Sequence, residues 1–150
     1  MRLKNSFFNP SSDKKSSMRN KIDHEVIESL DLFIKKLNDE SKSDSLLVVE
    51  GKNDARALIS LGFKGNLFLL CNKSLVKLSD EADKYKKIIL LLDLDRKGRL
   101  LTRKSILILQ GQKKKIDLFY RKKIKKVTKG RIKQIEHLTR YRDTSNIPIY

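Results

Sequence analysis

The chain has 150 residues, with 35 Lys and Arg against 18 Asp and Glu, and its formal net charge is +17. This length suits one compact domain, and a hydrophobic fraction of 39% is large enough to cover a sheet with helices. The one cysteine excludes an intramolecular disulfide and a zinc cage of several cysteines. No apolar stretch approaches the roughly 18 residues of a membrane span, so we expect a soluble, cytoplasmic protein that does not enter a membrane.

Residues 1–20 mix Ser, Asn and Lys with little apolar periodicity, which is typical of a flexible tail. From Ile22 onward, apolar residues recur at helical spacing and predict an amphipathic helix that ends near residue 40. We therefore expect a tail over 1–20, a single domain over 21–142 and a second tail over 143–150.

Four short apolar runs have the length and flanking residues of buried strands. They lie at residues 46–49, 67–70, 88–92 and 116–119. Helical patterns separate them, at 53–61, 74–84 and 98–110. Strands and helices that alternate in this way form parallel β-α-β units, with helices on both faces of the sheet. The predicted fold class is α/β, a three-layer α/β/α sandwich around a four-stranded parallel sheet.

The last part of the predicted domain is basic over 120–126, and a final helix is expected over 128–140. Apolar residues recur there at spacings of three, at Ile132, Ile135 and Leu138. Thr128 is suited to cap the start of such a helix.

Positive charge is concentrated in one part of the chain. Residues 1–95 hold 17 basic and 15 acidic residues, whereas residues 96–142 hold 18 basic and two acidic residues. This second segment therefore carries most of the net charge, which predicts a surface that binds a polyanion, with nucleic acid as the expected partner. A ribonucleoprotein surface without chemistry and a purely solubilising role are the alternatives.

Acidic residues follow two of the predicted strands. Glu50 and Gly51 come after the first strand, and Asp93 and Asp95 come at the end of the third. Functional groups of an open parallel sheet gather at the carboxyl ends of strands, where the strand order reverses. The period of two along a strand puts Asp93 and Asp95 on one side. Glu50 joins them only if the first and third strands are neighbours, which predicts the sheet order 2-1-3-4.

Three carboxylates that converge beside a sheet repel one another unless a cation or protons intervene. Mg²⁺ suits such a site because it takes one or two carboxylates, keeps several waters and completes its shell with substrate phosphates. Gly51 and Gly98 let the backbone come close, and the first-turn amides of the following helices offer a cradle for phosphate. Either motif alone would more often be a solvated loop, but the two together at strand ends favour a metal site.

Two segments resemble the Toprim domain, namely LVVEGKND at residues 47–54 and LLDLDRKGR at residues 91–99. Topoisomerases, bacterial-type primases, overcoming-lysogeny-defect proteins, recombination-repair proteins and rRNA-maturing nucleases share this domain. The resemblance covers roughly residues 45–120, and the chain resembles the small stand-alone archaeal Toprim proteins. It implies that Glu50 is a general acid/base or metal ligand, that Asp93 and Asp95 hold Mg²⁺, and that Asp54 supports them.

The resemblance implies nucleotidyl transfer or phosphodiester hydrolysis on RNA or DNA with one or two Mg²⁺ ions, for which Mn²⁺ is a possible substitute. The sequence shows no tyrosine-bearing topoisomerase cleavage domain, no zinc-binding domain of the bacterial-type primases and no ATPase P-loop. We therefore expect a small Mg²⁺-dependent nuclease or nucleotidyltransferase, with RNA processing among its roles. The alternative is a non-catalytic RNA- or DNA-binding subunit of a larger processing assembly.

Two other protein classes place acids after strands. A haloacid-dehalogenase-type phosphatase should supply further acids downstream and carry its Asp-x-Asp on the first strand. A response-regulator receiver needs two acids after the first strand and one after the third, which is the reverse of the count here.

Basic residues near the acids and in the segment after the fourth strand are the expected phosphate contacts. They are Lys52, Arg96, Lys97, Arg99, Arg103, Arg121, Lys122, Lys123, Lys125 and Lys126. Tyr120 and Tyr141 are candidates for stacking on exposed bases, whereas Phe119 is expected in the core. Cys71 is expected to be a small buried hydrophobe.

Overall fold

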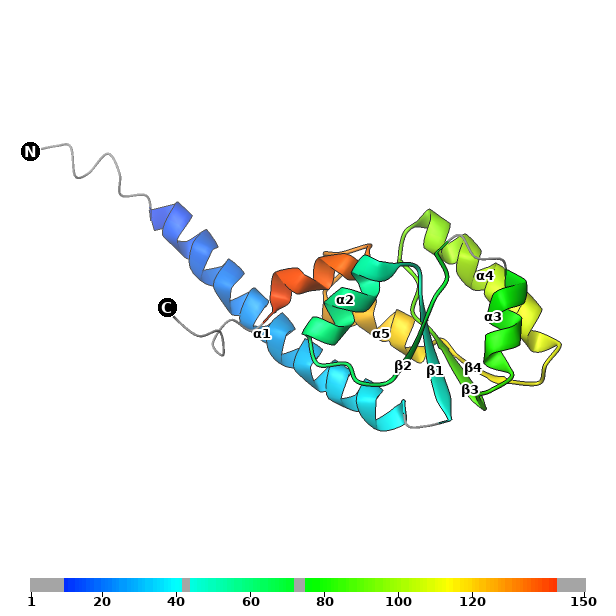
Figure 1. Ribbon diagram of the computed structural model, residues 1–150. Coiled ribbons are helices and arrows are strands. Elements are labelled where there is room, and N and C mark those ends of the chain that lie inside the picture. The colour runs from blue at the N-terminus through cyan, green and yellow to red at the C-terminus, as the bar shows by residue number, and fades with distance from the viewer. Residues whose placement is uncertain (1–9, 42–43, 72–74, 143–150) are drawn as a thin grey trace, which may run out of the picture.

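A computed structural model describes residues 10–41, 44–71 and 75–142 of the chain (Figure 1). Its sheet has four parallel strands in the order β2-β1-β3-β4. They are β1 (Ser45–Val49), β2 (Asn66–Leu69), β3 (Lys87–Leu90) and β4 (Lys115–Asp117). The predicted α/β fold class and the sheet order 2-1-3-4 are confirmed, and each strand lies within one or two residues of its predicted position.

Helices cover both faces of the sheet, which gives the predicted three layers (Figure 1). Side chains alternate along β1, so Leu47 and Val49 enter one core while Leu46 and Val48 enter the other. The first core also contains residues of α1 (Pro10–Glu40), α2 (Lys52–Ser60), α5 (Phe119–Val127) and the 3₁₀ helix η1 (Ile135–Tyr141). The second core is closed by α3 (Leu75–Ala82) and α4 (Arg96–Gln110).

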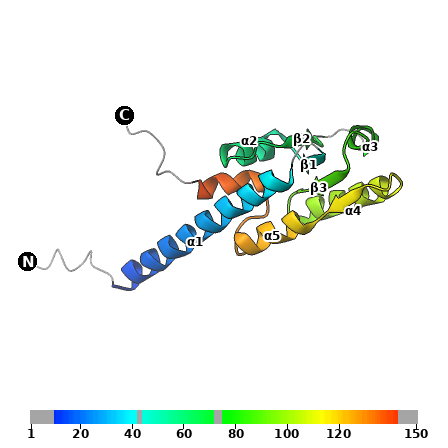
Figure 2. The ribbon, with the colours of Figure 1, turned by 90° about the horizontal axis from the view of Figure 1, so that it is seen from below.

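The first helix begins at Pro10, so the predicted start near Ile22 was wrong. Proline fits the first helical position because its ring fixes φ and its missing N–H has no helical partner there. Figures 1 and 2 show this end of α1 projecting beyond the body of the domain, which is why apolar periodicity begins only further along. Residues 1–9 and the predicted tail over 143–150 lie outside the described residues.

The predicted helix over 128–140 was also wrong. Helix α5 ends at Val127, and the hydroxyl of its C-cap residue, Thr128, donates to the carbonyl of Ile124 at 2.8 Å. Lys129 and Gly130 then adopt positive φ, as residues after helix ends often do. The apolar spacing of three belongs to η1, because three residues per turn place Ile135, Leu138 and Tyr141 on one buried face.

Two expectations about single side chains are reversed. Tyr120 and Tyr141 are buried, whereas the Phe119 side chain on the same helix as Tyr120 is 46% exposed. Cys71 is exposed and has a positive φ, so it is not a buried hydrophobe. Within the described part of the chain, no helix has the length and apolar character needed to span a membrane.

Candidate active site

Acidic side chains meet at the carboxyl edge of the sheet, where β1 and β3 lie side by side. Glu50 directly follows β1, and Asp93 stands three residues after the end of β3. Asp93 is 7% exposed. The negative charges of Glu50 and Asp95 raise its pKa, and its own charge raises the pKa of Asp54. The strand order thus brings together acids that are more than 40 residues apart in sequence.

Asp95 has a role that the strand pattern did not predict. Strand β3 ends at Leu90, so the alternation along a strand does not reach the Asp-x-Asp pair. Asp95 is the N-cap of α4, and its Oδ1 accepts a hydrogen bond from the Gly98 N–H at 2.7 Å. The cap uses one carboxylate oxygen, which leaves the other as a candidate metal ligand.

Backbone amides of η1 hold two of the acids. The Ile135 N–H donates to Asp93 Oδ1 at 2.8 Å, and the Glu136 N–H donates to Asp54 Oδ1 at 3.0 Å. The Gly51 N–H donates to the other Asp54 oxygen at 3.1 Å. Sequence reasoning missed this role of η1, because a backbone donor leaves no residue signature; the buried spacing of three was the only signal that the segment packs against the domain.

Some backbone amides at the starts of α2 and α4 already donate hydrogen bonds to side chains of the protein. The N–H groups of Gly51 and Gly98, expected to help cradle phosphate, donate instead to Asp54 and Asp95. Gly98 is still required for close approach, because a Cβ there would lie 1.8 Å from the Asp93 carbonyl oxygen. A Cβ on Gly51 would meet nothing within 4 Å, so packing within the described residues does not require a glycine at this position.

Burial is the main reason that Asp54 and Asp93 are difficult to ionise. It raises the pKa of Asp93 to about 6; the charges of Glu50 and Asp95 add to the effect, and the Ile135 N–H opposes it. The pKa of Asp54 is raised to about 6 by burial and by the charge of Asp93. Glu50 Oε1 is buried and has no hydrogen-bond partner among the described residues. The positive charge of Arg121 acts on Glu50, Asp93 and Asp95, but it offsets only part of the cost, because the pKa of Asp93 stays raised.

These residues fit a hard divalent cation. Their donors are carboxylate oxygens, as Mg²⁺ prefers, and an unpartnered buried oxygen on Glu50 is available. The described residues do not hold three acids, histidines or cysteines already arranged around one cation position, so the expected convergence of three carboxylates is not seen. Mg²⁺ needs only one or two carboxylates because waters and phosphates complete its shell.

A pocket of about 480 Å³ opens beside the acids. Glu50, Asp54 and Asp93 line it, together with Lys52, Cys71 and Glu136. Cys71 reaches this position because its N–H donates to the carbonyl of Glu50 at 2.7 Å. The pocket is large enough for a small ligand group such as a nucleotide phosphate and sugar.

Arg121 supports the acidic loop and is not the free phosphate contact expected of it. Its Nη2 donates to the Asp93 carbonyl at 2.7 Å, and its Nε donates to the Leu92 carbonyl at 3.2 Å. Burial lowers its pKa, as expected for a guanidinium held against the protein body. The remaining predicted phosphate contacts are exposed, and Arg96, Arg99 and Arg103 line a separate hollow around Leu100 on α4.

The raised pKa values of Asp54 and Asp93 predict that metal-free protein loses stability as pH rises. For each acid the pKa in the folded protein lies above its ordinary value of 3.8, so the stabilising contribution is complete below about pH 3.8 and is lost as pH rises through about 6. Urea unfolding in a chelating buffer between pH 5 and pH 7.5 should show a fall on the order of 2 kcal/mol. The fall should be smaller in Asp93→Asn; an equal fall in that variant would contradict the assignment.

Comparison with known proteins identifies similar chains. A family model described as the Toprim domain matches residues 45–127. A UPF0292 protein from Pyrococcus abyssi is 36% identical over 95 residues, which cover 63% of this chain and 72% of the relative. A UPF0292 protein from Methanocaldococcus jannaschii is 33% identical over 119 residues, covering 78% and 87%. A solved structure, a putative protein from Aquifex aeolicus, matches with a TM-score of 0.62 and 33% identity over 70% of this chain and 94% of that one.

Proposed function

The chain belongs to the Toprim domain family, whose members generally carry out metal-dependent chemistry on nucleic acids, and from this premise we propose that it cleaves or transfers phosphodiester bonds of RNA or DNA with Mg²⁺. The observation that carries the proposal is the acidic cluster at the carboxyl edge of the sheet, in which Asp54 and Asp93 are buried and Glu50 and Asp95 are half-buried. Burying several acids together is unfavourable without a cation, so the cluster is better explained by a function than by stability.

Glu50, Asp93 and Asp95 are the residues that would hold the metal. When bound, Mg²⁺ would neutralise phosphate charge and lower the pKa of a bound water. The Glu50 carboxylate, beside acidic neighbours, would move a proton to or from the attacking or leaving oxygen. Arg96 and Lys97, exposed at the start of α4, would stabilise the negative charge that develops on the phosphate.

The proposal is tested by incubating the protein with end-labelled single- and double-stranded RNA and DNA in Mg²⁺ or Mn²⁺. We expect metal-dependent products that disappear in the Asp93→Asn/Asp95→Asn variant. Both substitutions keep an oxygen that can accept the hydrogen bonds from Ile135 and Gly98, so folding is preserved. Equal product formation by wild type and variant would refute the proposed site.

A second candidate is the non-catalytic RNA- or DNA-binding subunit of a processing assembly. It is favoured by the hydrogen bonds of Asp54, Asp93 and Asp95, each of which accepts from a backbone N–H as a structural acid would. Salt-dependent binding of nucleic acid without any product in Mg²⁺ or Mn²⁺ would support this candidate instead.

The basic face of α5 predicts a measurable salt dependence. Lys122 and Lys125 are exposed, and replacing both with glutamine should weaken nucleic-acid binding and reduce the slope of log K against log salt by about 1.4–1.8. Titrations at four salt concentrations would measure this slope, with exposed Lys64→Gln as the control. An unchanged slope in the double variant would remove this face from the interface.

A further inference from the structure

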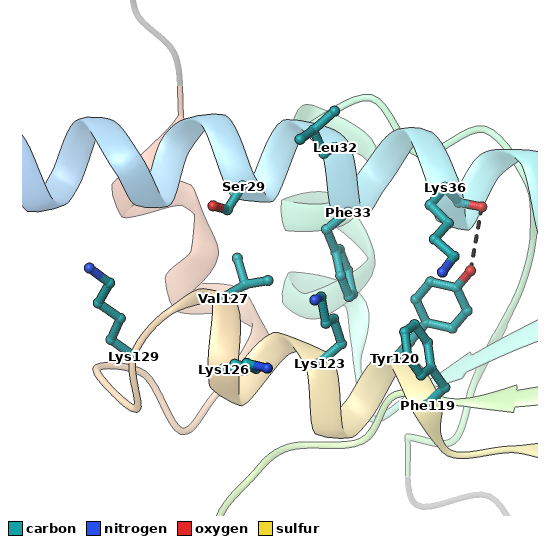
Figure 3. A pocket seen from close by; sticks show the side chains of 10 residues that line it. All are labelled: Ser29, Leu32, Phe33, Lys36, Phe119, Tyr120, Lys123, Lys126, Val127 and Lys129. Atoms are coloured by element: carbon teal, nitrogen blue, oxygen red, sulfur yellow. Dashed lines mark hydrogen bonds between the residues drawn. The ribbon is translucent and has the colours of Figure 1, made fainter.

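A second pocket lies between α1 and α5 (Figure 3). Its volume is about 410 Å³. Leu32 and Phe33 of α1 and Phe119 of α5 supply apolar surface, and Lys36, Lys123 and Lys126 supply positive charge. We call it the α1/α5 groove; its α1 wall lies outside the segment that the Toprim family model matches.

Phe119 presents a fixed aromatic ring to this groove. The ring meets Tyr120 edge to face, with 5.2 Å between centroids, and Tyr120 in turn packs on Phe33 at 5.5 Å. Both Tyr120 and Phe33 are buried, so they fix the position of Phe119, which is itself 46% exposed. The Lys36 ammonium lies over one face of the Phe119 ring, 4.6 Å from its centre, so a base that stacks on this face would displace the exposed lysine. A large aromatic side chain that is rigid yet exposed is a suitable platform for a stacking ligand.

The charge of the groove is unbalanced. No acidic side chain lines it, and Lys123 and Lys126 form no ion pair with any described residue. Lys129, at one end, is already paired with Glu25 at 3.1 Å. The groove therefore favours a ligand that is both anionic and able to cover an aromatic ring.

We propose that the α1/α5 groove binds a single-stranded segment of nucleic acid, with an unpaired base against Phe119 and the neighbouring phosphates on Lys123 and Lys126. Base stacking and backbone charge are the two terms that hold single strands on proteins. The volume is that of a pocket for one small-molecule-sized unit, such as a nucleotide. An acidic amphipathic helix would also complement the positive charge of the groove lysines, but such a helix binds through several apolar side chains along a longer groove.

The groove and the acidic cluster are separated by the first turn of α5. Phe119 faces the groove, and Arg121, two residues later, donates to the Asp93 carbonyl. Both sites therefore contact residues of the first turn of α5. The inference rests on the proposed function for the class of polymer and deepens it, because it makes the substrate a nucleic acid with a single-stranded segment next to the reacting phosphate.

Binding is tested without metal, so that its result does not depend on catalysis. Fluorescence anisotropy in EDTA would compare labelled 12-nucleotide single strands of RNA and DNA with the corresponding duplexes. Phe119→Leu should weaken single-strand binding about tenfold and change duplex binding less than about twofold, whereas Phe119→Tyr should bind like wild type. Leu107→Ala, which alters a leucine on α4 that is 71% exposed, is the control and should have no effect.

Three outcomes would overturn the inference. They are unchanged single-strand binding in Phe119→Leu, an equal loss for duplexes, and competition by an acidic amphipathic peptide when the Phe119 variants bind nucleic acid normally. Failure of the proposed function gives a different pattern, in which Phe119→Leu selectively loses single strands but wild type forms no product in Mg²⁺. Circular dichroism spectra that match wild type would show that each variant is folded.

Discussion

Replacing Asp93 with asparagine is expected to lower turnover by about a thousandfold or more. The same substitution should stabilise the metal-free fold at pH 7.5. Asparagine keeps the shape and the acceptor for the Ile135 N–H, but it removes a buried charge beside Glu50 and Asp95. Because the pKa of Asp93 is raised from 3.8 to about 6, its ionised form costs on the order of 1–3 kcal/mol at this pH. Urea unfolding in EDTA measures this gain in the free energy of unfolding.

Asp80→Asn is the matched control, because Asp80 is exposed on α3 and lies outside the acidic pocket. It should change neither stability nor turnover. A fall in the stability of Asp93→Asn would contradict the account, since it would mean that the carboxylate holds the fold together instead of being held in place at a cost. Such a trade between stability and activity is common where a site is built for chemistry.

Gly98→Ala is expected to lower the free energy of unfolding by about 3 kcal/mol or more. The new Cβ would lie 1.8 Å from the Asp93 carbonyl oxygen, which cannot easily move because Arg121 Nη2 donates to it at 2.7 Å. The clash would also displace the Asp93 backbone, so turnover should fall with stability. Urea unfolding followed by circular dichroism provides the measurement.

Gly51→Ala is the control for this second prediction. Gly51 has an extended φ of −149°, and an added Cβ would meet nothing within 4 Å. Its effect on stability should stay below about 1 kcal/mol, because alanine fits this backbone conformation without strain. Equal losses in Gly51→Ala and Gly98→Ala would show that the close approach at Gly98 does not control the loop.

Much of the architecture could be predicted because the strands are short, apolar and bounded by polar turns. The sheet order followed from one further assumption, that Glu50 and Asp93 serve the same site, and the pairing of Val48 with Leu90 agrees with it. The family resemblance rested on the same two segments, and the family match over residues 45–127 includes both.

The sequence predictions that were wrong failed for physical reasons. The start of α1 could not be predicted from apolar spacing, because that end of the helix projects beyond the body of the domain (Figure 2). The reversal of Phe119 and Tyr120 followed from placing residue 119 in a strand, whereas it is the first residue of α5. The hydrogen bond from η1 to Asp93 could not be predicted from the sequence, because its donor is a backbone amide.

We infer that Glu50, Asp93 and Asp95 form one metal centre that acts on a bound polymer. The most direct test is a titration of Mn²⁺ into metal-free protein with a saturating oligonucleotide, followed by the paramagnetic resonance signal of free Mn²⁺. The Asp93→Asn/Asp95→Asn variant with the same oligonucleotide accounts for ions held by the polymer itself. We predict that wild type binds one or two more ions than the variant and that Mg²⁺ displaces them; equal binding by both proteins would contradict the account.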